Sequence, residues 1–146
     1  MELETYFGMV ENCIKNLGVD PAVCRLEKAG QWDLKKGSAS VWIDVFKSET
    51  NNFAGYFQCM APVVQVPTSM TKEFYEEILE KNHSLYAVSL VKYKDWIYIK
   101  TIRELEGIDQ NEMFALITRV GNYADDLDDY YNNKYHGGGF NSPKSV

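Results

Sequence analysis

Residues 109–131 read DQNEMFALITRVGNYADDLDDYY and carry the most regular pattern in this 146-residue chain. Asp109 and Glu112 match a capping box, which marks the start of a helix. Apolar side chains then recur at helical spacing: Met113, Leu116, Ile117, Val120, Tyr123, Ala124, Leu127, Tyr130 and Tyr131. The segment therefore predicts a long helix whose apolar face is docked on the rest of the protein.

Two further segments predict helices. Residues 3–17 place apolar side chains on one helical face, and Gly18 followed by Pro21 supplies the expected stop. A shorter central helix is predicted from Thr71, the expected N-cap, to about Asn82. Helices are therefore predicted near both ends of the chain and in its middle.

The residues between the helices predict β-strands. A first hairpin is expected from about Val23 through the β-rich run 40–46, and a third extended run covers residues 53–66. Pro62 interrupts that run and implies an edge position or a bulge. Two more runs, 85–93 and 96–103, flank a two-residue break that predicts a hairpin.

Alternation within the run 41–46 separates two faces of the predicted sheet. Val41, Ile43 and Val45 point one way, and Trp42, Asp44 and Phe46 point the other. The first face is aliphatic and suits a core. The second is mixed.

The length predicts one domain, at residues 1–135, that buries a core without disulfides or structural metal. Residues 136–146 include three consecutive glycines and predict a flexible tail. The N-terminus has neither a basic region nor an apolar region of a secretory signal, and no apolar run is long enough to span a membrane. We therefore expect a cytoplasmic protein with no membrane partner.

The charge balance disfavours nucleic acid as a partner. Fifteen Lys and Arg against 21 Asp and Glu give a net charge of −6, which repels phosphate backbones. Lys92, Trp96, Tyr98 and Lys100 do interleave charge with aromatic rings, as in single-strand binders. Lysines at the turn and edges of a hairpin are more simply explained as protection against edge pairing.

No pattern predicts catalytic, cofactor-binding or metal-binding residues. Cys13, Cys24 and Cys59 lack the spacing of a zinc or redox motif and are expected to be reduced and mostly buried. A catalytic pair of Cys59 and His83 is disfavoured, because a thiol in an apolar strand is usually an inert packing group. The carboxylates of residues 125, 126, 128 and 129 spread around a helix and predict a solvated acidic face, not a metal cluster. The chain is expected not to be an enzyme.

The predicted order, helix, three strands, helix, two strands, helix, resembles the small α+β fold of the YbjN-like family of bacterial sensory transduction regulators, which is similar to type III secretion chaperones. Local matches run in the same order along about residues 1–135: Gly30-Gln31-Trp32, Gly37-Ser38-Ala39, the β-run ending in Phe46, Ala61-Pro62-Val63 with Val66-Pro67, residues 76–82, the strand pair, and Leu105 with Ile108-Asp109 before Glu112. The resemblance implies a five-stranded antiparallel sheet with helices largely on one face and often a homodimer. For the secretion chaperones it implies binding of an unfolded partner segment, and it brings no catalytic residues.

Aromatic side chains form the candidate interaction surface, because three helices on one face cannot cover all of them. The residues are Trp42, Phe46, Tyr56, Tyr86, Trp96 and Tyr98. Permanent cover by a helix or a second subunit is the structural alternative. The leading hypothesis is a non-enzymatic, dimeric interaction or chaperone-like module that binds a segment of a partner protein. The alternative is a regulatory domain in which a small apolar ligand, held between sheet and helices, shifts the oligomeric state.

Overall fold

The order of helices and strands is the predicted one in the computed structural model, which describes residues 2–37 and 39–137. The elements are α1 (Leu3–Asn16), a 3₁₀ turn (Pro21–Val23), β1 (Gln31–Lys36), β2 (Ala39–Lys47), β3 (Gly55–Gln65), α2 (Thr71–Asn82), β4 (Ser89–Tyr93), β5 (Trp96–Glu104) and α3 (Gln110–His136). The strands form one antiparallel sheet in the order β1-β2-β3-β5-β4. This confirms the predicted α+β class, element order and strand number.

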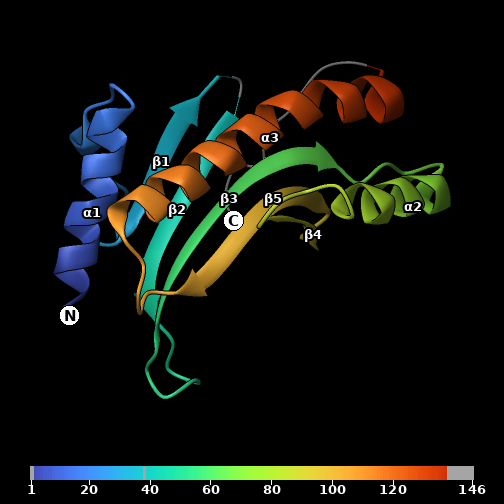
Figure 1. Cartoon of the computed structure of the whole chain (residues 1–146). Helices are drawn as coiled ribbons and strands as arrows, with labels where there is room; N and C mark the ends of the chain where they lie inside the picture. The colour runs from blue at the N-terminus through green and yellow to red at the C-terminus, as the bar shows by residue number, and fades with distance from the viewer. Residues whose placement is uncertain (1, 38, 138–146) are drawn as a thin grey trace.

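The helices pack on one face of this sheet. The long helix α3 lies across the strands, mainly on β3 with further contacts to β2 and β5, and α1 lies beside it near β2 (Figure 1). The shorter helix α2 packs at the other end of the sheet, against β4. The opposite face of the sheet therefore receives neither α1 nor α3.

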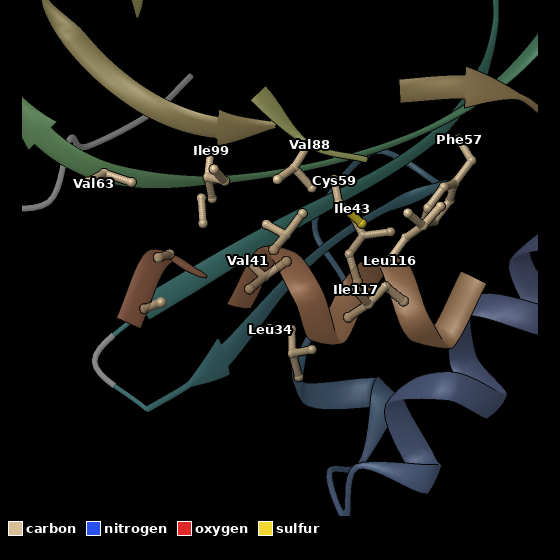
Figure 2. Close-up of a cluster of buried hydrophobic side chains, with 14 of the residues drawn as sticks. Leu34, Val41, Ile43, Phe57, Cys59, Val63, Val88, Ile99, Leu116 and Ile117 are labelled. Atoms are coloured by element: carbon tan, nitrogen blue, oxygen red, sulfur yellow. The ribbon is translucent and has the colours of Figure 1, made fainter. Parts of the chain in front are cut away.

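The aliphatic side chains of the strands and the apolar stripe of α3 form the core. Val41 and Ile43 of β2 and Cys59 of β3 point toward α3, where Leu116 and Ile117 meet them (Figure 2). Each of these five side chains is at most 6% exposed. Val41, Ile43 and Val45 are all buried, and their neighbours Trp42, Asp44 and Phe46 are partly exposed, so the predicted alternation is confirmed.

Pro62 lies in the middle of the sheet, and the bulge alternative is the correct one. The register of β3 against β5 shifts between Pro62 and Val64, which accommodates a residue without a backbone N–H. The extra residue lets Val63 and Val64, consecutive in sequence, both be fully buried.

Several predicted element ends are wrong. The N-cap of α2 is Met70, which has a left-handed φ of 56° and no capping side chain, so Thr71 is already helical. Phe53 (φ 56°) lies in the β2–β3 turn, and Ala87 (φ 56°) lies before β4, which begins at Ser89 and not at Leu85. Left-handed backbone is incompatible with continued strand pairing, and propensity does not reveal it for these residue types.

The predicted hairpin at Lys94-Asp95 is confirmed. Both residues have positive φ, 47° and 68°, as a two-residue turn between strands requires. Asp and other short polar residues tolerate this conformation better than most.

In α3 the predicted cap is confirmed and the predicted acidic face is partly wrong. The Asp109 side chain accepts a hydrogen bond from the Glu112 N–H at 2.7 Å. Asp128 is only 2% exposed, so it does not belong to a solvated face. Its carbonyl accepts from Asn132 Nδ2, which also donates to the Val63 carbonyl of the β3 bulge. The helix extends to His136, and residues 138–146 of the predicted tail lie outside the described residues.

Candidate functional site

The sheet face opposite α1 and α3 carries most of the aromatic residues singled out in the sequence. Side chains alternate along each strand, so the neighbours of the buried aliphatic residues point to this side. Cross-strand pairing aligns them: Trp42 lies opposite Met60, which lies opposite Lys100. We call this surface the open face and define it by Trp42, Asp44, Phe46, Tyr56, Gln58, Met60, Tyr93, Trp96, Tyr98, Lys100 and Ile102.

One aromatic group is centred on Tyr98, and we call it the Trp42 group (Trp42, Met60, Tyr93 and Tyr98). The ring centroids of Trp42 and Tyr98 are 5.9 Å apart, and those of Tyr93 and Tyr98 are 6.4 Å apart. Tyr98 is 1% exposed and Met60 5%, although neither belongs to the hydrophobic core cluster beneath the helices. The open face thus has a small apolar cluster of its own.

A second aromatic group, the Phe46 pair, lies nearer the β2–β3 turn. Phe46 and Tyr56 are directly opposite each other on β2 and β3, with stacked rings 5.7 Å apart. The Tyr56 hydroxyl accepts a hydrogen bond from Asn51 Nδ2 in the turn. This bond fixes the outer end of the pair.

A polar row, formed by Gln31 of β1, Asp44 of β2 and Gln58 of β3, separates the two aromatic groups. On β5 the residue opposite Gln58 is the apolar Ile102. Burial raises the pKa of the Asp44 carboxyl, and a hydrogen bond with Gln31 and the charge of Lys28 only partly offset this effect. An anion that is partly removed from water therefore lies between two apolar groups.

The structure brings together five of the six predicted surface residues, from β2, β3 and β5, but Tyr98 is buried and is not itself available for contact. Tyr86 does not join them in a strand: it lies in the connection before β4 and is 74% exposed. Sequence reasoning omitted Ile102 and Tyr93, which are 47% and 42% exposed. Alternation from Trp96 and Tyr98 along β5 would have identified Ile102, but only the β4–β5 register identifies Tyr93.

The metal-binding groups and the Cys59–His83 pair considered from the sequence can be checked among the described residues. Within residues 2–37 and 39–137, no three His, Cys, Asp or Glu side chains are grouped so that they could hold a metal ion. Cys59 is fully buried, and desolvation raises the pKa of its thiol well above the ordinary value, whereas His83 is exposed at the C-terminus of α2. All three cysteines are buried free thiols, as predicted. None of the helices in the described part of the chain is long and apolar enough to cross a membrane.

A separate surface cleft of about 530 Å³ lies between α1 and the segment 25–32. On its wall the Glu11 carboxylate accepts two hydrogen bonds from Arg25, both at 2.7 Å, and one from Trp32 Nε1 at 3.0 Å. The bonds from Arg25, helped by the one from Trp32 and opposed by burial, lower the pKa of Glu11 to about 2. Three hydrogen bonds from the protein's own side chains already occupy this carboxylate, so we interpret the contact as structural.

Comparison with known proteins identifies the fold. No protein-family model matches the chain, and no curated protein matches it by sequence. A chain of the ExsC–ExsE complex has a TM-score of 0.61 at 10% identity, over 86% of this chain and 92% of that one. A chain of the ExoU–SpcU heterodimer from the type III secretion system of Pseudomonas aeruginosa has a TM-score of 0.59 at 11% identity, over 82% and 94%.

A third match is YbjN from E. coli, described as a candidate transcription regulator, with a TM-score of 0.53 at 16% identity over 93% of this chain and 94% of that one. Identities this low establish the fold and not the function. The chain therefore has the YbjN-like, type III secretion chaperone-like fold, as the resemblance implied.

Proposed function

We propose that this protein is a non-enzymatic, cytoplasmic interaction module whose open face binds a segment of a partner protein. The observation that carries the proposal is the gathering of Trp42, Phe46, Tyr56, Trp96 and Tyr98 on the one sheet face to which neither α1 nor α3 contributes. Two structures with this fold, ExsC–ExsE and ExoU–SpcU, are complexes with a second protein, which supports the proposal by analogy.

The composition of the face suits protein binding. Rigid aromatic rings bury a large area at a low cost in side-chain entropy, and they dominate the energy of many interfaces. Ile102 and Tyr93 are 47% and 42% exposed, so apolar area is available beside the two aromatic groups. A polar row in the middle gives such a surface the means to select among segments.

The test compares capture of partner proteins from a lysate by two matched double variants. Trp42→Ser with Phe46→Ser removes one ring from each aromatic group. The control, Val23→Ser with Leu26→Ser, also removes two apolar side chains, which are 76% and 45% exposed and lie on the 3₁₀ turn and in the segment before β1.

We expect the wild type and the control to retain the same bound proteins, identified by mass spectrometry, and the Trp42/Phe46 variant to lose them while its circular dichroism stays native. Equal capture by all three baits would show that the partner binds a surface other than the open face. Loss in the control alone would favour the segment before β1.

A further inference from the structure

We propose that the segment bound on the open face carries a basic side chain, preferably arginine, which pairs with Asp44 between the Trp42 group and the Phe46 pair. This inference rests on the proposed function and adds the chemistry of the partner to it. The open face therefore binds a cation as well as apolar side chains.

Asp44 lies in the interior of the sheet, with a strand on each side. On β2 its neighbours on the same face are Trp42 and Phe46, and across the sheet it lies opposite Gln58 on one side and Gln31 on the other. Both flanking strands therefore present neutral amides at this position and no cation. The charge of Lys28, in the segment before β1, lowers the pKa of the Asp44 carboxyl less than burial raises it. None of the ion pairs between described residues includes Asp44.

A second carboxylate on the same side of the sheet, that of Asp33, has both a hydrogen-bond donor and a cation as partners. Asp33 of β1 lies opposite Trp42, accepts from Ser40 Oγ at 2.5 Å and pairs with Lys35 Nζ at 3.4 Å. Asp44 lies further inside the sheet and has no cation of this kind among the described residues. A partly desolvated carboxylate in that situation gains free energy when a cation is brought to it.

The flanking rings decide which kind of cation fits best. A cation above Asp44 lies near Trp42 on one side and Phe46 on the other, and the faces of aromatic rings attract cations. Arginine is favoured over lysine, because its planar guanidinium stacks on rings and pairs with a carboxylate through two parallel hydrogen bonds. The amide oxygens of Gln31 and Gln58 can accept remaining N–H groups.

The overall charge of the chain also favours a basic partner segment. A net charge of −6 steers basic segments toward the protein and repels acidic ones. A wholly apolar segment would bury Asp44 further without pairing it, and that cost would select against such a segment.

The experiment titrates the ¹⁵N-labelled full chain with three capped peptides, acetyl-Leu-Thr-X-Thr-Leu-amide, in which X is arginine, citrulline or glutamate. In an extended peptide the two leucines and X lie on one face. Citrulline keeps the shape of arginine and removes its charge. Wild type, Asp44→Asn and, as the matched control, Asp33→Asn are compared.

We expect the arginine peptide to shift the amide signals of residues 42–46 and 56–60 and to bind about tenfold or more tightly than the citrulline peptide, a factor typical of one charge-assisted contact. Asp44→Asn should reduce this ratio to about one, and Asp33→Asn should leave it unchanged. Independently, the pKa of Asp44, followed by ¹³C NMR of its carboxyl, should fall when the arginine peptide binds to wild type. That measurement needs no variant.

Three results would overturn the inference. Equal binding of the arginine and citrulline peptides would leave the open face as a docking site without a basic requirement. A preference for arginine that survives in Asp44→Asn would assign it to another carboxylate. If no peptide shifts the open-face signals, the face does not bind such segments, and the proposed function fails as well; dissociation of a dimer by Ile102→Glu in sedimentation would then assign the face to a second copy.

Discussion

The side chain of Asn82, the last residue of α2, makes both hydrogen bonds to the backbone of Leu90 in β4. Leu90 N–H donates to Asn82 Oδ1 at 2.7 Å, and Asn82 Nδ2 donates to the Leu90 carbonyl at 3.3 Å. β4 is an edge strand, because it pairs with β5 on one side and with no strand on the other. The side-chain amide of Asn82 occupies the position that a peptide group of a further strand would take. It thereby joins α2 to the sheet and covers part of an edge strand.

Asn82→Ala should destabilise the fold by about 1–3 kcal/mol, because it leaves the N–H and C=O of Leu90, a 5% exposed residue, without partners. The free energy of unfolding in urea measures the loss, and hydrogen exchange at the Leu90 amide should become faster. Asn82→Asp keeps the acceptor for the Leu90 N–H and should retain slow exchange there. Unchanged exchange in Asn82→Ala would mean that the Leu90 amide is protected by something else.

The expected homodimer can pair through α2 or through the β4 edge, and we predict α2. Leu79 on α2 is 70% exposed, whereas Asn82 already covers the β4 edge at Leu90. Sedimentation velocity should therefore give a dimer for wild type, a monomer for Leu79→Glu, and a dimer for Lys92→Pro, which removes an N–H of the β4 edge. The reverse pattern for the two variants would assign the interface to the edge, and a monomeric wild type would refute the dimer.

Glu11 should make the protein sensitive to acid. Its pKa in the folded state is about 2 and its ordinary value is 4.5, so its stabilising effect is complete above about pH 4.5 and is lost as the pH falls through 2. The shift sets an upper bound of about 3 kcal/mol. The Arg25 side chain is 57% exposed, and screening by water reduces the expected value to about 1 kcal/mol.

Urea unfolding of wild type and Glu11→Gln measures this effect. The variant should be less stable at pH 7, and the difference should shrink steadily between pH 4.5 and pH 2. A difference that is independent of pH would assign the effect to lost packing and not to the charge.

Gly30 and Gly8 should respond in opposite ways to replacement by alanine. Gly30 has a φ of +89°, and a Cβ there would lie 2.6 Å from the Val45 carbonyl oxygen, a backbone atom that cannot move without disturbing the β1–β2 pair. Gly30→Ala should therefore cost about 2 kcal/mol or more. Gly8 lies inside α1 with open space around it, so Gly8→Ala should raise stability by up to about 1 kcal/mol. Melting temperatures of the two variants, which add the same methyl group, provide the comparison.

The sequence by itself determined the order and type of the elements, because hydrophobic periodicity reports which face of each segment is buried. The stripe on residues 109–131 and the alternation in residues 41–46 were sufficient for the fold class and for the core face of β2. The same alternation placed Trp42 and Phe46 on the opposite face. The left-handed residues Met70 and Ala87, which mark the beginnings of α2 and β4, gave no signal, because no pattern of apolar residues depends on them.

The tertiary structure alone decided which residues meet across strands. Register joins Trp42 to Tyr98 and sets Asp44 between two aromatic groups, and it depends on the bulge at Pro62 and on pairings between residues far apart in the chain. It also buried Asp128, which periodicity assigned to a solvated face, because the Asn132 side chain beside it is held by the carbonyl of Val63 on β3. Local patterns specify what each segment can bury, and only the packed sheet determines what each side chain touches.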